Sequence, residues 1–96
     1  MMVKLNSKQT KVYRQIWAKP TTKTLKFSDV DKLLAAIGCK RTTKGGANVV
    51  FEYDGHTWGM HPPHPRPLVK PPYVQQIRKF LVDSGIKQLI EENSDD

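Results

Sequence analysis

The spacing of apolar residues changes near residue 39, and this change limits the possible folds more than any other feature of the sequence. Before it, Val30 is followed by apolar residues at i+3, i+4 and i+7, the pattern of a helix that buries one face. After it, Val49, Phe51 and Tyr53 occupy alternate positions, as in a half-buried strand. The chain therefore combines helices with a small sheet.

Turn and cap residues indicate where these elements begin and end. Ser28 is suited to cap the helix before the change, and Gly38 is suited to end it. Asp54-Gly55 is a strong signal for a two-residue hairpin turn. We therefore expect strands at residues 39–43, 49–53 and 56–60 to form a three-stranded antiparallel meander.

Two further helices flank this unit. Residues 6–18 have apolar residues at helical spacing and stop before Pro20, and a last helix runs from Pro72 to Gly85. The predicted class is α+β. Its order is the αβββα arrangement of double-stranded-RNA-binding-domain-like folds, with a three-stranded antiparallel sheet and an extra N-terminal helix.

The chain has 96 residues, which is room for one domain. We expect a single domain over residues 1–90, with the N-terminal helix at 6–18, the core at 27–86 and an acidic disordered tail at 91–96. The single cysteine, Cys39, cannot form an internal disulfide. No apolar run approaches the roughly 20 residues of a membrane span, and no secretory signal is present. These features favour the cytoplasm.

Positive charge is concentrated at the start of the chain. The formal net charge is +7, and the first 26 residues hold seven Lys or Arg residues and no acid. Lysines near phosphate groups release counterions, so a polyanionic partner is the natural interpretation. The alternative interpretation is that the positive charge only keeps the protein soluble.

Residues 61–67, His-Pro-Pro-His-Pro-Arg-Pro, form the densest cluster of chemically capable side chains. RNA cleavage without a metal needs a base for the 2′-hydroxyl, an acid for the leaving 5′ oxygen and a cation near the phosphate. His61 and His64 could transfer these protons, and Arg66 could hold the phosphate. The alternative is that both imidazoles bond backbone carbonyls in a rigid loop.

The glycine turn after the first strand is a second candidate site. It places Lys40, Arg41 and Lys44 beside Gly46, where free backbone N–H groups could bind phosphate oxygens. An ordinary charged hairpin tip has the same composition. Trp58 could stack on a base, although a tryptophan in a strand more often belongs to the core.

Other chemistries find little support in the sequence. His56, His61, His64 and Cys39 could be zinc ligands, but their spacing matches no common closed zinc site. Walker loops, serine-nucleophile motifs and paired carboxylates are absent from the sequence. We therefore expect no metal and no small-molecule cofactor.

Five segments, taken in order, resemble the HicA family of toxins, and they span the chain from residue 6 to residue 86. Residues 61–65, His-Pro-Pro-His-Pro, resemble the His-x-Pro-His-Pro motif of one branch of that family. Residues 46–48, Gly-Ala-Asn, fall where the family carries Gly-Ser-His or, in that branch, Gly-Ser-Arg. The other matching segments are residues 6–20, 27–38 and 74–85.

The resemblance implies the toxin of a type II toxin–antitoxin system. Such a toxin has the double-stranded-RNA-binding-like fold, cleaves mRNA without a metal, and is neutralised by a HicB-like antitoxin that covers its active surface. The position of the family's catalytic histidine is Asn48 here, and asparagine cannot transfer a proton near neutral pH. Either His61 or His64 has taken that role, or the protein binds RNA or its antitoxin without cutting.

These expectations require one composite surface. An mRNA strand must lie across the glycine turn and the histidine loop, where Lys40, Arg41, Lys44 and the basic helix of residues 6–18 would engage it. A third possibility is a structural interaction protein whose basic arm meets an acidic partner. No membrane partner is expected.

Overall fold

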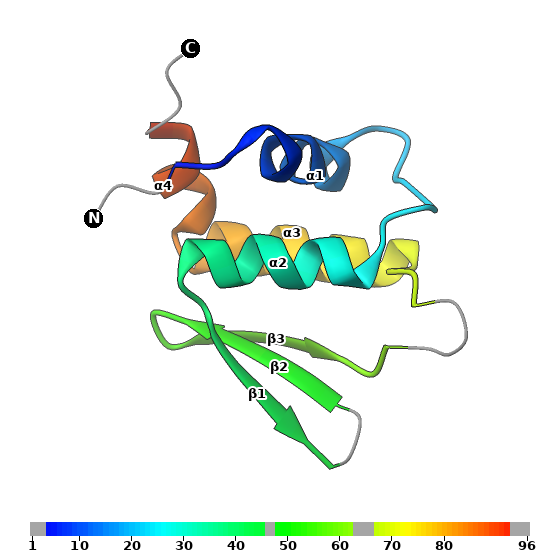
Figure 1. The fold of residues 1–96 in the computed structure, drawn as a ribbon, viewed down its shortest axis with the longest axis vertical. Coiled ribbons are helices and arrows are strands. Elements are labelled where there is room, and N and C mark those ends of the chain that lie inside the picture. The colour runs from blue at the N-terminus through cyan, green and yellow to red at the C-terminus, as the bar shows by residue number, and fades with distance from the viewer. Residues whose placement is uncertain (1–3, 46–47, 63–66, 93–96) are drawn as a thin grey trace.

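The computed structural model describes residues 4–45, 48–62 and 67–92 (Figure 1). Within them the predicted α+β class is confirmed: an αβββα unit follows an additional N-terminal helix, and a further short helix ends the described chain. The elements in chain order are α1 Ser7–Trp17, α2 Phe27–Ile37, β1 Lys40–Lys44, β2 Asn48–Tyr53, β3 His56–Met60, α3 Pro71–Asp83 and α4 Ile86–Glu92.

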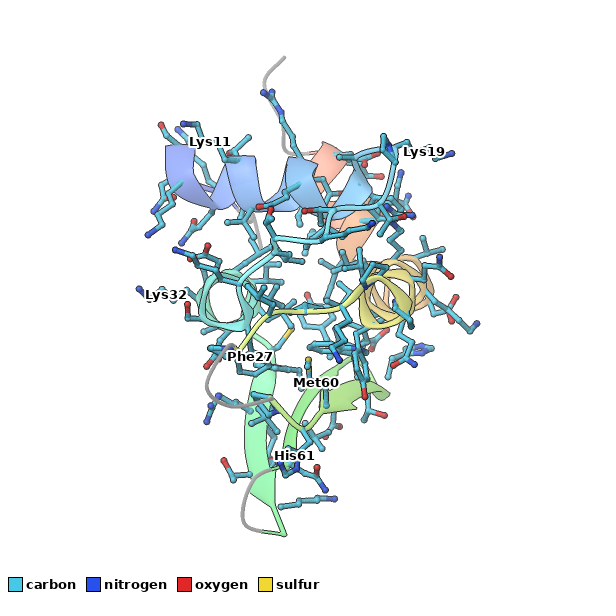
Figure 2. The ribbon with its side chains drawn as sticks, turned by 90° about the vertical axis from the view of Figure 1, so that its right-hand side faces the viewer. Lys11, Lys19, Phe27, Lys32, Met60 and His61 are labelled. Carbon is cyan, nitrogen blue, oxygen red and sulfur yellow. The ribbon has the colours of Figure 1, made fainter. Side chains whose placement is uncertain are left out.

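The elements form three layers (Figures 1 and 2). The antiparallel sheet has the strand order β1-β2-β3, and α2 and α3 lie side by side across one of its faces. Helix α1 lies on the other side of α2 and α3, where it buries Val12, Tyr13 and Ile16. The α2–α3 layer therefore separates α1 from the sheet.

Apolar side chains hold the sheet to the helices. Leu33 of α2 and Ile77 of α3 are fully buried. On the sheet side, Phe51 stacks on Trp58 with 5.9 Å between ring centroids. Burying an apolar side chain of this kind stabilises a fold by about 1.5–3 kcal/mol. These buried side chains therefore hold the sheet against α2 and α3.

The predicted turn residues adopt the backbone conformations that their roles require. Gly38 follows α2 with φ of 108°, in the left-handed region that favours glycine at a helix end. Asp54 and Gly55 have φ of 52° and 81°, and they close the hairpin between Tyr53 and His56. Positive φ at both residues is the mark of the type I′ hairpin turn.

The predicted Ser28 cap is wrong, because α2 begins one residue earlier, at Phe27. Its N-cap is Lys26, which makes no side-chain cap hydrogen bond. Instead, Lys26 forms a β-bridge with Leu68, and the Phe27 N–H donates to the Pro67 carbonyl at 2.8 Å. A segment about 40 residues away therefore accepts the hydrogen bond of the first backbone N–H of α2. A local capping pattern could not reveal this contact.

The folded chain extends beyond the predicted boundary at residue 90. The unpredicted helix α4 buries Ile86 and Ile90 and runs to Glu92, so residues 91 and 92 are helical; residues 93–96 of the expected tail lie outside the described residues. Glu91 accepts a hydrogen bond from the Tyr13 hydroxyl at 2.9 Å, which joins α4 to α1. Burial, assisted by this hydrogen bond, raises the pKa of Tyr13.

No helix within the described residues is long and apolar enough to cross a membrane. The longest of them, α3, has 13 residues and a polar face.

Candidate nucleic-acid interface

The sheet has two different faces because successive side chains of a strand point to opposite sides. Val49, Phe51, Trp58 and Met60 are buried on the inner face, under α2 and α3. No described helix covers the opposite face, which we call the open face (Figure 1). It consists of Lys40, Thr42 and Lys44 from β1, Asn48, Val50 and Glu52 from β2, and Thr57, Gly59 and the following His61 from the β3 side.

The strand register brings three residues of the open face into one row at the end of the sheet. Lys44 pairs with Asn48 across β1 and β2. Val49 pairs with Met60 at the end of the ladder between β2 and β3, and Asn48 and His61 are the next residues beyond this last pair. We call Lys44, Asn48 and His61 the end row. Directly opposed residues in antiparallel strands have Cα atoms about 4.5–5.5 Å apart.

The side chains of the end row are free to meet a ligand. All three are exposed, and within the described part of the chain none of them makes a side-chain hydrogen bond or an ion pair. The row therefore offers an ammonium, an amide and an imidazole without intramolecular competition. Phosphate oxygens accept hydrogen bonds from all three kinds of group.

Two of the predicted segments are close in sequence to residues of the end row. Residues 46–47 connect β1 to β2, and residues 63–66 follow shortly after His61. The predicted site residues Gly46, His64 and Arg66 belong to these segments and lie outside the described residues. Their described neighbours lie at one end of the sheet, as the composite surface requires; Figure 2 shows His61 at the end far from α1.

Arg41 does not share the open face with Lys40 and Lys44. It is opposite Phe51 in the register, so its side chain points to the helix side. There its Nε donates to the Asp31 carboxylate of α2 at 3.0 Å. The predicted grouping of three bases is wrong in this respect, because alternation along a strand separates neighbours in sequence.

Trp58 is not available for the predicted base stacking. Its side chain is 4% exposed, and its indole ring is stacked on Phe51. A base would need an open ring face, and the core occupies it. The other interpretation, that a strand tryptophan belongs to the core, is confirmed.

The basic N-terminal helix does not extend the open face either. Lys11 of α1 and His61 lie at opposite ends of the molecule in Figure 2, with the α2–α3 layer between their elements. Packed helices are separated by 8–10 Å between their axes. The positive charge is therefore divided between two surfaces, and the engagement of mRNA by both α1 and the sheet lysines stays a prediction.

Gly59 is a residue of the open face that the sequence analysis missed. A Cβ atom built there would lie 2.9 Å from the Val49 carbonyl oxygen and 3.1 Å from a methyl group of Val50. Any side chain would therefore push β3 away from β2, next to the pair of Val49 and Met60 that precedes His61. A glycine inside a strand pattern is the signal that indicates such a close approach.

Three of the four side chains considered as zinc ligands, those of Cys39, His56 and His61, are separated, and His64 lies outside the described residues. His56 and His61 stand at opposite ends of β3, and a strand of this length spans about 17 Å. Cys39 is buried in the core. Ligands of one zinc ion lie within about 2.3 Å of it, so these three residues cannot share an ion in this fold.

No protein-family model, no curated protein and no solved structure matches the chain.

Proposed function

We propose that the protein is a metal-independent endoribonuclease that acts on mRNA, and that the end row belongs to its active site. The observation that carries this proposal is that Lys44, Asn48 and His61 are exposed at one end of the sheet, without side-chain partners among the described residues. Phosphoryl transfer needs a proton acceptor beside groups that stabilise the extra negative charge on phosphorus. The row supplies both.

In the proposed reaction, the His61 imidazole takes the proton of a ribose 2′-hydroxyl while that oxygen attacks the adjacent phosphorus. The bond from phosphorus to the 5′ oxygen breaks, and this oxygen leaves with a proton from a second acid, for which the sequence offers His64. Lys44 and the Asn48 amide stabilise the phosphorane oxygens. The products are a 2′,3′-cyclic phosphate and a 5′-hydroxyl.

The resemblance to HicA-like toxins suggests the setting of this reaction. We propose that the protein is the toxin of a type II toxin–antitoxin system in the cytoplasm, where mRNA is available. A HicB-like antitoxin would neutralise it by covering the open face. Production of the chain alone should then arrest growth, and a His61→Ala chain should be tolerated.

A ribonuclease assay in the presence of a chelator tests the proposal. His61→Ala should lower the cleavage rate at least about hundredfold, because general acid–base catalysis contributes that much or more. His56→Ala is the matched control, since His56 is also exposed but stands at the other end of β3. Products without 2′,3′-cyclic phosphate ends, or equal rates for both variants, would contradict the mechanism.

A second candidate function, RNA binding without cleavage, is favoured by Asn48. This residue is the centre of the end row and cannot transfer a proton. Asn48→His would place a second imidazole beside His61. If this variant cuts RNA and the natural chain only binds it, the protein is a binding module built on a nuclease scaffold.

A further inference from the structure

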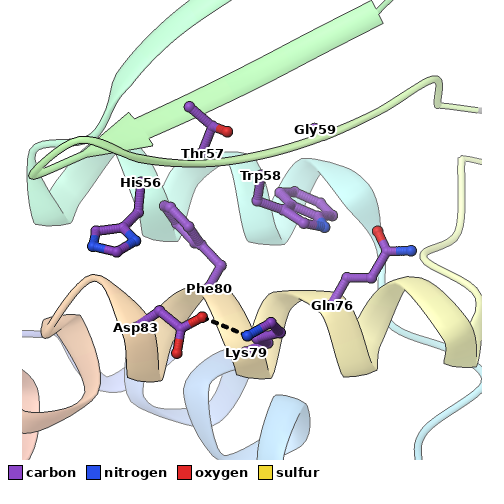
Figure 3. A pocket seen from close by; sticks show the side chains of 8 residues that line it. All are labelled: His56, Thr57, Trp58, Gly59, Gln76, Lys79, Phe80 and Asp83. Atoms are coloured by element: carbon purple, nitrogen blue, oxygen red, sulfur yellow. Dashed lines mark hydrogen bonds and ion pairs between the residues drawn. The ribbon is translucent and has the colours of Figure 1, made fainter.

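A groove separates the free edge of the sheet from helix α3 (Figure 3). Residues 56–59 of β3 form one wall, and Gln76, Lys79, Phe80 and Asp83 of α3 form the other. Its volume is about 290 Å³, enough for several side chains or a short stretch of backbone. The groove lies beside the sheet edge and does not include the end row.

Backbone groups of β3 are left without strand partners at the edge of the sheet beside this groove. The two-residue turn makes Tyr53 and His56 a hydrogen-bonded pair, and alternation makes Phe51 and Trp58 another. The N–H and C=O groups of Thr57 and Gly59 therefore point away from β2. Within the described residues, neither makes a backbone hydrogen bond outside the sheet. An edge with free donors and acceptors is a template for another strand.

The indole N–H of Trp58 also lacks an acceptor. It is buried, and no group in the described chain accepts its hydrogen bond. Figure 3 shows the indole nitrogen on the side of the ring that faces α3 and Gln76. Gln76 is exposed and makes no hydrogen bond within the described residues. Buried polar groups are normally satisfied, so this exception indicates a missing partner.

We propose that this groove binds an acidic protein segment in extended conformation, which adds to β3 as a further strand and lies along α3. A peptide backbone supplies both the donors and the acceptors that Thr57 and Gly59 need, whereas an RNA backbone supplies chiefly acceptors. This interface goes beyond the proposed nuclease function and uses a different surface.

Charge favours an acidic segment. The Trp58 indole and the Lys79 ammonium add donors to the edge N–H groups, whereas the Gln76 amide can donate or accept. The one carboxylate among its described lining residues, Asp83, is already paired with Lys79 at 2.8 Å. The chain as a whole carries a net charge of +7, which attracts an acidic partner during association.

Amide NMR spectra of the full chain test the proposal with a capped hexapeptide of alternating Glu and Val. This peptide should shift the backbone amides of Thr57 and Gly59 and the indole N–H of Trp58 in a saturable way. A Lys–Val peptide, and a Glu–Val peptide with alternate backbone nitrogens methylated, should bind at least about tenfold more weakly. No shift at about 1 mM peptide, or equal binding of all three, overturns the proposal.

A pair of charge reversals supplies the matched control. Lys79→Glu and Lys87→Glu each break an exposed i,i+4 ion pair, but only Lys79 lines the groove. Lys79→Glu should weaken binding of the acidic peptide about tenfold, and Lys87→Glu should change it less than about twofold. Equal losses overturn the proposal, as does displacement of the peptide by a uridine oligonucleotide. Ribonuclease activity of both variants should stay unchanged, which keeps the two proposals separable.

Discussion

Cys39 lies between α2 and β1 with its thiol in the core, and burial raises the pKa of this thiol to about 11. Only the thiolate attacks a disulfide reagent. At pH 8 the native protein should therefore react at least about a hundredfold more slowly than the urea-unfolded chain, whose thiol has a pKa of about 8.5. Absorbance of the released aromatic thiol measures both rates, and similar values would mean that Cys39 is accessible.

The same raised pKa links Cys39 to stability at alkaline pH. The unfolded chain loses the thiol proton first, so the contribution of this residue is full below about pH 8.5 and falls as the pH rises towards 11. The difference in unfolding free energy between the natural chain and Cys39→Ala should shrink over this interval. Urea titrations at pH 8 and pH 10 measure it, and a constant difference would contradict the linkage.

Individual residues show how far a local pattern can predict a site. The sequence indicated Lys44, Asn48 and His61 separately, through a turn and a resemblance; the register then pairs Lys44 with Asn48, and His61 follows the last pair of β3 at the same end of the sheet. Arg41 was misplaced because a run of bases conceals the alternation of strand faces. Trp58 was ambiguous because residue type alone does not reveal whether a ring face is covered.

At the scale of elements, Arg78 of α3 secures the end of α1. Its Nε donates to the Ile16 carbonyl at 2.7 Å, and its Nη2 donates to the Ala18 carbonyl at 3.0 Å. The last carbonyls of a helix have no partner within the helix, and a cation there also complements the helix dipole. Arg78→Met should lower the free energy of unfolding by about 1–2 kcal/mol.

Urea denaturation followed by tryptophan fluorescence measures this loss. Gln75→Met is the matched control, because Gln75 lies on the exposed surface of the same helix and makes no hydrogen bond within the described residues. Its effect should stay within about 0.5 kcal/mol. A similar effect of both substitutions would show that the contact between α3 and α1 does not stabilise the fold.

Element types were easier to predict than element limits. The three strands and the first two helices follow from apolar period and turn residues, which are local signals. The start of α2 depends on the bridge between Lys26 and Leu68, and α4 is held by its contact with Tyr13. Both contacts join residues more than 40 positions apart. The start of α2 therefore had no local signal, whereas the apolar spacing of Ile86, Leu89 and Ile90 is a short helical pattern that the prediction missed.

For the whole molecule, the arrangement of layers decides which charges act together. An apolar stripe shows that α1 buries one face, but it does not show against which element, so the sequence could not separate α1 from the sheet. The structure puts the lysines of α1 and those of the open face on opposite sides of the α2–α3 layer (Figures 1 and 2). A single RNA strand bound to the open face should therefore contact only some of the basic side chains that give the net charge of +7.

This division predicts how the affinity for RNA depends on salt. Each phosphate contact to a single strand contributes about −0.7 to the slope of log affinity against log salt concentration. Lys44→Ala should make the slope less steep by about this amount, because Lys44 belongs to the end row. Lys11→Ala removes an equal charge from α1 and should leave the slope unchanged, since α1 lies beyond the α2–α3 layer. Fluorescence anisotropy with a labelled single-stranded oligonucleotide measures both slopes. An equal reduction by Lys11→Ala would put the RNA across α1, and the open face would no longer be the nucleic-acid interface.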